Sequence, residues 1–116
     1  MKSRSAQPDG EGAETPAQRV LALISSIPAG RVVTYRDVAE YLGLRSPRQV
    51  GRALAGVPPG VPWHRVVHSD GTMAEPVRDR QRRLLLDEGV GIAGTRVDLR
   101  THRWSGRDIR RPPATE

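Results

Sequence analysis

The chain has 116 residues, the length of one domain with a modest hydrophobic core. It lacks cysteine, which excludes disulfides, thiolate catalysis and cysteine-rich zinc sites, and aromatic residues make up only 3% of it. The 19 Lys and Arg residues outnumber the 13 Asp and Glu residues and give a net charge of +6, a balance that favours a polyanionic partner.

We expect one ordered domain between two polar ends. Residues 1–14 have no periodic apolar pattern and predict a disordered N-terminal arm, and residues 105–116 predict a disordered basic tail. The domain then covers residues 15–104. Because the sequence shows neither an apolar leader nor a long apolar run, we expect a cytoplasmic protein without membrane contact.

Two predicted helices open the domain, and each begins with a capping box. Thr15 can cap the first helix, with Gln18 three residues later. After a short β-rich stretch, Thr34 and Asp37 repeat the pattern, and Gly43 ends the second helix.

A third predicted helix follows after a link of only a few residues. It begins at Ser46, ends at Gly56, and carries Arg48 and Arg52 one turn apart. Two short helices joined by so short a turn indicate a helix-turn-helix. The alternative is a basic, solvated helix of an ordinary helical core. Small residues such as Gly51 favour the first interpretation, because they let a helix backbone approach a nucleic-acid groove.

The remainder of the domain predicts one more helix and a little β structure. Residues 56–72 are irregular, and Pro58, Pro59 and Pro62 fix the chain before a short Val-rich strand. Residues 76–89 predict a fourth helix with Pro76 in its first turn and Gly89 as its terminator. Residues 90–104 alternate enough to predict a strand or wing. The expected fold is mainly α with a small β component, a winged-helix-like helix-turn-helix domain.

Four motifs at consistent spacing resemble the DNA-binding domain of O6-alkylguanine-DNA alkyltransferases: IPAGRVVTYRDVAEYLG, RQVGRAL, PWHRVV and DEGV. Those repair proteins carry a Pro-Cys-His-Arg-Val loop whose Cys takes the alkyl group from guanine, and Trp63 stands at that position here. The replacement is the mark of alkyltransferase-like proteins, which bind O6-alkylguanine in DNA without repairing it. The resemblance thus implies a non-enzymatic monomer that uses neither cofactor nor metal.

The resemblance also implies a lesion-binding pocket formed by Trp63, Tyr35, Val66 and Arg78. An indole cannot replace a thiolate as an alkyl acceptor, but its flat apolar face can support an alkylated base. The alternative for Trp63 is a core residue. Arg78 is the nearest candidate for an arginine that lies over the lesion in some relatives.

Two residues match the family's base-flipping apparatus. Arg48 matches the arginine that fills the gap left by the extruded base, and Tyr35 matches the tyrosine that presses on the 3′ phosphate. The alternatives are a phosphate contact for Arg48 and simple packing for Tyr35. In this family the recognition helix occupies the minor groove, which implies DNA contacts by Arg45, Gly51, Arg52 and Ala53.

His64 and Glu88 match a relay that activates the Cys in the alkyltransferases. Without a thiol to activate, we expect them to fix the loop by hydrogen bonds. The alternative is that they activate water for a hydrolysis, because a His with a carboxylate partner is a common base.

The predicted function is therefore a sensor that flips O6-alkylguanine out of double-stranded DNA and directs it to nucleotide excision repair proteins. It would be associated with the nucleoid when bound to DNA. Two other functions stay open, a winged-helix regulator without lesion preference and a hydrolase. The arginine excess does not decide between them, because it fits either bidentate phosphate contacts or GC-rich codons.

Overall fold

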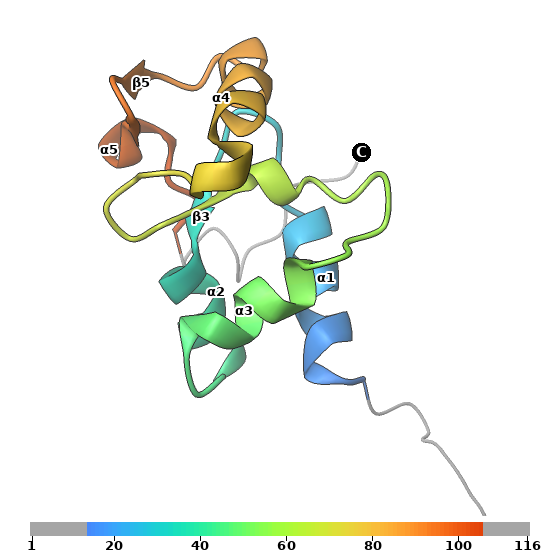
Figure 1. The fold of residues 1–116 in the computed structure, drawn as a ribbon. Helices are drawn as coiled ribbons and strands as arrows, with labels where there is room; N and C mark the ends of the chain where they lie inside the picture. Colours follow the sequence, from blue (N-terminus) through green and yellow to red (C-terminus); the bar gives the residue numbers. More distant parts are fainter. Residues whose placement is uncertain (1–13, 106–116) are drawn as a thin grey trace, which may run out of the picture.

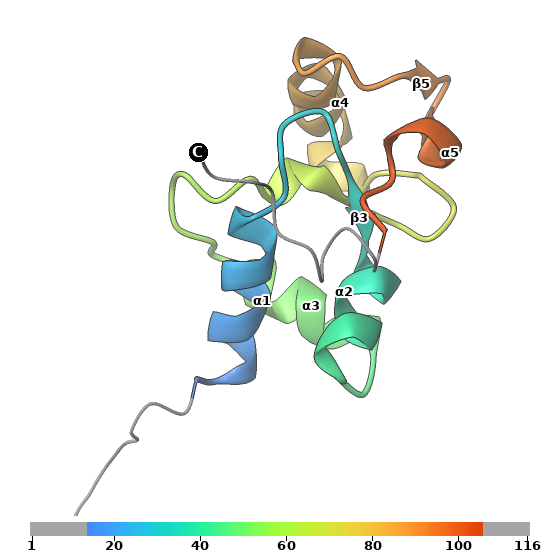
Figure 2. The same ribbon diagram turned by 180° about the vertical axis from the view of Figure 1, so that it is seen from behind.

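The computed structural model describes residues 14–105, which form short helices and two small two-stranded sheets (Figures 1 and 2). The predictions of a disordered arm and a basic tail fall almost entirely on residues 1–13 and 106–116, which lie outside the described residues. In chain order the elements are α1 (Pro16–Ser25), β3 (Val33–Thr34), α2 (Tyr35–Leu42), α3 (Pro47–Leu54), the 3₁₀ turn η1 (Trp63–Arg65), β4 (Val66–Val67), η2 (Glu75–Val77), α4 (Arg78–Asp87), β5 (Ile92–Ala93), β6 (Arg96–Val97) and α5 (Leu99–His102). None of the described helices could cross a membrane.

The helices α1, α2 and α3 form one half of the molecule around a shared core (Figures 1 and 2). The predicted capping box of α1 is confirmed, because the Thr15 hydroxyl accepts from the Gln18 amide at 3.1 Å and Gln18 Oε1 accepts from the Thr15 amide at 2.8 Å. Apolar residues of all three helices meet in the core, among them Ile24, Val38 and Val50.

The predicted helix-turn-helix is present as α2 and α3. Thr34 and Asp37 form the expected capping box, and Gly43 ends α2 with a φ of 71°. Ser46 then caps α3, its hydroxyl accepting from the backbone amide of Arg48 at 3.2 Å. This short connection fixes the two helices against each other.

A two-stranded parallel sheet joins the helical half to the rest of the chain. Its strands β3 and β4 pair Val33 with Val66 and Thr34 with Val67. All four residues are buried. The residue that follows each strand, Tyr35 or His68, therefore emerges at the same edge of the sheet.

The second half contains α4, the β5–β6 hairpin and α5, and two predictions need correction there. Pro76 lies in the 3₁₀ turn η2 rather than in the first turn of α4. Residues 99–102 form α5, not a strand, because the Asp98 side chain accepts from the Thr101 amide and hydroxyl at 3.4 and 2.7 Å and so caps a helical turn. The predicted fold class is confirmed, a mainly helical domain with a small β component.

Candidate nucleic-acid interface

The loop that carries Trp63 is anchored by its neighbours. Residues Trp63–Arg65 form the turn η1, and Gln81 of α4 donates from Nε2 to the carbonyls of His64 at 3.0 Å and Val66 at 2.8 Å. Gln81 is only 2% exposed, so water hardly competes for these bonds. The loop backbone is thereby held without any contribution from the indole.

A charged cluster fixes the same loop from its other side. Glu88 accepts from Arg65 Nη2 at 2.6 Å, lies 2.8 Å from His64 Nε2, and accepts from the Gly30 amide at 3.2 Å. Burial opposes the charge on Glu88, but the hydrogen bonds from Arg65 and His64 outweigh it and lower its pKa from 4.5 to about 2. Arg65 also donates to the Ile27 carbonyl at 2.7 Å. The cluster ties the loop to the chain after α1 and to the end of α4.

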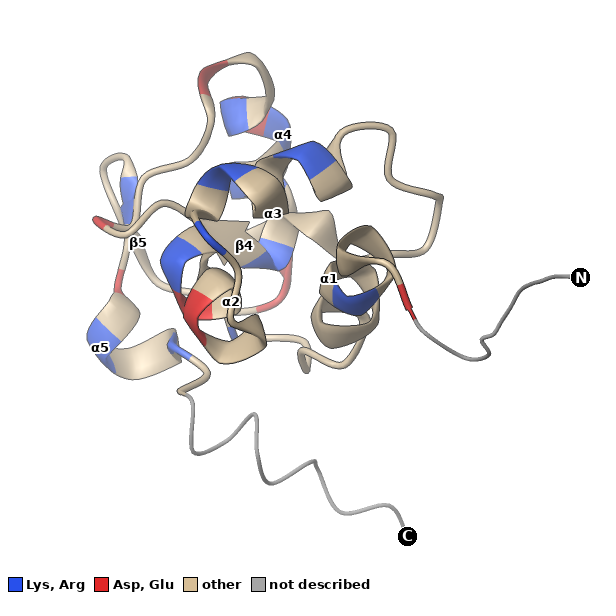
Figure 3. Ribbon diagram, turned by 90° about the horizontal axis from the view of Figure 1, so that it is seen from below, with Lys and Arg blue, Asp and Glu red and all other residues tan. Residues whose placement is uncertain are grey.

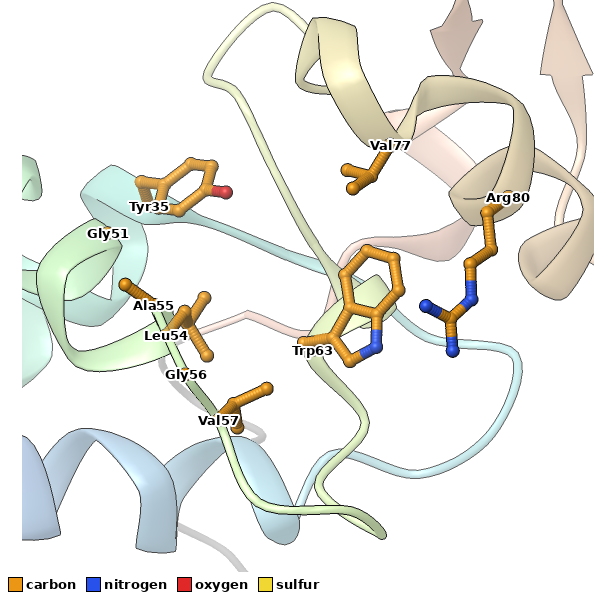
Figure 4. Close-up of a pocket in the computed structure, with 9 residues that line it drawn as sticks. All are labelled: Tyr35, Gly51, Leu54, Ala55, Gly56, Val57, Trp63, Val77 and Arg80. Carbon is orange, nitrogen blue, oxygen red and sulfur yellow. The ribbon is translucent and has the colours of Figure 1, made fainter.

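A cavity of about 390 Å³ opens beside the Trp63 loop (Figure 4). In Figure 4 Trp63 lies on one side of the cavity, with Tyr35 and Leu54 opposite and Val77 above the indole. The guanidinium carbon of Arg80 lies 5.5 Å from the centroid of the indole ring, within the range of a cation–π contact. The cavity thus combines a flat aromatic face, apolar walls and one cation.

The structure brings only part of the predicted lesion pocket together. Trp63 and Tyr35 line the cavity, whereas the Val66 side chain is 1% exposed in the core and its carbonyl already accepts from Gln81. Arg78 pairs with Glu75 at 2.5 Å and is not among the residues that line the cavity.

Arg80 is the cavity residue that the sequence reasoning missed. It lies three residues after Val77, about one helical turn, and both side chains line the cavity. That spacing is the signal that could have selected Arg80 instead of Arg78.

A second depression, of about 380 Å³, adjoins the cavity. Tyr35 and Gly51 line both, so they form the wall between them. Arg48 and His68 line the second depression only, and the rings of His68 and Tyr35 have their centroids 5.3 Å apart. Burial raises the pKa of Tyr35, so its hydroxyl keeps the proton that it could donate to a phosphate.

The other predicted DNA contacts lie on and before α3. Gly51 has open space where a Cβ atom would stand, with no atom within 4 Å. Ala53 packs partly against the core, Arg52 is exposed, and Arg45 lines a third depression of about 410 Å³. Figure 3 shows Arg positions on α2, α3 and α4. This side of the molecule therefore offers a basic, concave surface to a polyanion.

Among residues 14–105 there is no group of three or more His, Asp or Glu residues that could hold a metal ion. His64 and His102 each have hydrogen-bond partners within the fold. The chemistry available at this surface is hydrogen bonding, aromatic stacking and positive charge.

Comparison with known proteins gives one consistent result. Residues 15–90 match the family model described as 6-O-methylguanine DNA methyltransferase, DNA binding domain. A DNA base-flipping protein of Escherichia coli is 46% identical over 94 residues, covering 76% of this chain and 73% of its own. The alkyltransferase-like protein 1 of Schizosaccharomyces pombe is 38% identical over 100 residues, covering 74% of this chain and 91% of its own.

The solved structures agree with the sequence relatives. The crystal structure of S. pombe Atl1 in complex with damaged DNA containing O6-carboxymethylguanine matches with a TM-score of 0.71 and 35% identity, over 77% of this chain and 94% of that one. The resemblance drawn from the four motifs is confirmed by these findings.

Proposed function

Because the chain belongs to the family defined by the DNA-binding domain of 6-O-methylguanine DNA methyltransferases, we propose that it is a non-enzymatic sensor of O6-alkylguanine in duplex DNA. The observation that carries the proposal is the indole of Trp63, which lines a cavity in a sequence without cysteine. Alkyl transfer needs a nucleophile such as a thiolate, and an indole offers only a face for contact. The complex of the S. pombe relative with O6-carboxymethylguanine DNA supports the same assignment.

Recognition proceeds by extrusion of the damaged base into the cavity. In this scheme α3 lies in the minor groove, Arg48 fills the vacated place in the stack, and the Tyr35 hydroxyl donates to a backbone phosphate. Extrusion costs a few kcal/mol, and the cost is least for a damaged base whose pairing is already weak. Stacking on an aromatic side chain returns about 1–3 kcal/mol per base.

Selectivity for the alkylated base follows from the walls of the cavity. An O6-alkyl group adds apolar surface, and the indole of Trp63 and the side chain of Val77 can cover it. Arg80, whose guanidinium lies over the indole, places a cation next to the base. Undamaged guanine pairs well with cytosine and has no alkyl group to bury in the cavity. Its extrusion therefore costs more free energy and gains fewer contacts.

The alternative of a hydrolase built on His64 and Glu88 is disfavoured by the contacts of the pair. The carboxylate of Glu88 accepts from Arg65, His64 and the Gly30 amide. These contacts favour a structural role for both residues.

We further propose that the bound lesion is handed to nucleotide excision repair. Binding without alkyl transfer leaves the damage in the DNA, so another protein has to remove it. Incision of an O6-alkylguanine duplex by purified excision-repair proteins should increase when the chain is added. An unchanged rate of incision would remove this part of the proposal and leave the lesion-binding function intact.

The lesion-binding function is tested by equilibrium binding to two matched duplexes, one with O6-methylguanine and one with guanine, at the same salt concentration. We expect tighter binding to the damaged duplex, and mass spectrometry should find the DNA unaltered afterwards. Equal affinity for both duplexes would contradict the sensor, and loss of the methyl group or of the base would make the chain an enzyme.

A further inference from the structure

We propose that the loop of residues 55–62, called here the proline loop, is a hinged wall of the cavity beside Trp63. Its residue Val57 determines the length of the O6 substituent that the cavity accepts. The wall stays closed on a methyl group and swings outward for longer apolar substituents. The proposal rests on the proposed function, since it assumes that an extruded O6-alkylguanine enters this cavity.

The proline loop connects α3 to η1, and both of its ends reach the cavity. It follows Leu54, precedes Trp63, and projects from the body of the molecule between them (Figures 1 and 2). The cavity lining includes the end of α3 and the start of the loop, Leu54, Ala55, Gly56 and Val57. In Figure 4 the side chain of Val57 lies on the same side of the cavity as Leu54. Val57 is therefore part of the wall opposite the indole.

The size of the cavity makes the position of this wall important. Its volume of about 390 Å³ is near the lower end of the range of about 300–1,000 Å³ that ligand pockets span. A base stacked on the indole takes up much of this space, so a substituent longer than methyl has to displace a wall or project into water. Only displacement of the wall buries additional apolar surface.

The two ends of the proline loop are fixed to the rest of the fold. Leu54 and Val61 pack partly against the core of the helical half. The Trp63 amide donates to the Val61 carbonyl at 2.8 Å, which joins the end of the loop to the anchored turn η1. Movement is thereby confined to the residues between these anchors.

The middle of the loop is held only weakly. Residues 58–60 are exposed, and two of them are prolines, which have no amide hydrogen to donate. The Pro58 carbonyl accepts from the Val61 amide at 3.4 Å, which is longer than the usual range for such a bond. The Val57 amide donates to the Leu54 carbonyl at 3.1 Å, so both bonds close turns within one segment. An exposed segment with such local bonds opens at a low cost in free energy.

Two glycines in the left-handed conformation bound the movable segment. Gly56 has a φ of 71° and Gly60 a φ of 94°. Glycine populates positive and negative φ about equally, so both positions can absorb a rotation of the segment between them. The two prolines in that segment keep φ near about −65°, so residues 57–59 move as a unit.

Val57 is the side chain that this rotation carries towards or away from the indole. The loop consists only of Ala, Gly, Val and Pro, so it offers apolar contact without charge. Burial of each additional methylene of the substituent tightens binding by up to about fourfold, and the cost of moving the wall reduces this gain. The ligand class that fits is therefore an O6-alkylguanine with an uncharged, extended substituent.

The first experiment measures equilibrium binding to duplexes with guanine, O6-methylguanine or O6-butylguanine at one salt concentration. The wild type should bind the butyl duplex at least as tightly as the methyl duplex. The Val57→Ala variant should shift the ratio of these two dissociation constants about threefold to tenfold in favour of butyl, because a smaller side chain leaves more room. The Val57→Leu variant should shift it by a similar factor in favour of methyl.

The second experiment tests the hinge with Gly56→Ala. Alanine is strained at a positive φ, so the closed position should lose stability and the preference should shift towards the butyl duplex. No atom of residues 14–105 lies within 4 Å of a Cβ atom built at Gly56, so the substitution acts through the backbone. Gly94→Ala is the matched control, because Gly94 has a φ of 63° and similar open space but lies between β5 and β6, outside the cavity lining.

Amide hydrogen exchange tests the movement directly in the free protein. The Val57 amide should exchange about 100-fold faster than the Trp104 amide, or faster still. The Trp104 amide is the internal standard, because it donates to the buried Val32 at 2.7 Å. Equal protection of the two amides would show that the wall is rigid and would overturn the hinge.

The binding data separate this proposal from the proposed function. If the wild type prefers the methyl duplex to guanine but rejects the butyl duplex, or if neither Val57 variant changes the ratio, the movable wall is overturned and the sensor stands. If the wild type prefers neither damaged duplex, the sensor itself fails. Because Val57 is only half-buried, its variants should unfold close to the wild-type temperature, which circular dichroism checks.

Discussion

The guanidinium of Arg65 holds the carboxylate of Glu88 through three hydrogen bonds of 2.6 to 3.2 Å. Both side chains are less than one-fifth exposed. Removal of one partner from such a pair leaves the other charge buried without compensation, which is more costly than loss of a surface ion pair. The pair joins the Trp63 loop to the end of α4, so its loss should loosen the cavity as well as the fold.

Stability should fall in acid as Glu88 becomes protonated. The folded protein lowers the pKa of Glu88 from 4.5 to about 2, so this carboxylate stabilises the fold above pH 4.5 and loses its contribution as the pH falls from 4.5 towards 2. The shift corresponds to about 3 kcal/mol of unfolding free energy. Urea unfolding of the wild type and Glu88→Gln between pH 2 and 7 should show the variant to be less stable at pH 7 and less dependent on acid.

Glu75→Gln is the matched control for this experiment. Its side chain is 76% exposed and pairs with Arg78 three residues away, so the substitution should change the free energy of unfolding by less than about 0.5 kcal/mol. An acid dependence of Glu88→Gln equal to that of the wild type would assign the acid sensitivity to other carboxylates.

Trp63→Ala should impair DNA binding far more than folding. The indole lines the cavity, while Gln81 anchors the loop backbone. The loss of stacking should therefore weaken binding to the damaged duplex by about 1–3 kcal/mol and leave the fold intact.

Trp104 provides the control, because it is 5% exposed in the core and its replacement by Ala should lower the free energy of unfolding by about 3–5 kcal/mol. Thermal unfolding and equilibrium binding of both variants would separate the two roles, and a large stability loss for Trp63→Ala would place that indole among the core residues.

Arg80, not Arg78, should determine the preference for the damaged base. Arg80→Ala removes the cation that lies over the indole and should reduce the preference for the O6-methylguanine duplex about threefold to tenfold. Arg78→Ala removes the same charge but leaves the cation over Trp63 in place. The ratio of the two dissociation constants for each variant gives the measurement, and a greater loss of preference in Arg78→Ala would reverse the assignment.

Gly51 should matter for DNA and not for the fold. A Cβ atom at this helical position meets no atom within 4 Å, so Gly51→Ala should stabilise α3 by about 0.5–1 kcal/mol. The Gly51→Leu variant should also fold. Its leucine side chain should obstruct the approach of α3 to the minor groove and so weaken binding to both duplexes. Gly43→Ala serves as the converse control, because the φ of 71° at Gly43 should make this substitution destabilising without a direct effect on DNA. Undiminished binding by Gly51→Leu would exclude a close approach of α3 to the groove.

The local features of the fold could be predicted from the sequence, because each depends on residues three or four positions apart. The capping boxes at Thr15 and Thr34 are examples, since side chain and backbone donor lie in the same turn. Residues 99–102, which form α5, were predicted as part of a strand. The alternating apolar pattern of residues 90–104 favoured that prediction, although Asp98 is a helix-capping residue.

Contacts between residues far apart in the sequence could not be predicted from sequence patterns. The bond of Arg65 to Glu88 spans 23 positions, and the contact of Tyr35 with His68 depends on a sheet with only two residues in each strand. Such short strands give no periodic signal, because alternation needs at least four residues to be recognised. The prediction of Arg78 likewise depended on where α4 begins, and helix boundaries are the least certain part of a sequence prediction.

The anchoring of the Trp63 loop by its neighbours makes position 63 exchangeable. Gln81 holds the carbonyls on either side of Arg65, and Glu88 holds His64 and Arg65, so the scaffold stays the same whichever side chain stands between Pro62 and His64. If the side chain at position 63 meets the base, as proposed above, then one substitution there can change the chemistry of the cavity while the backbone that presents the side chain stays in place.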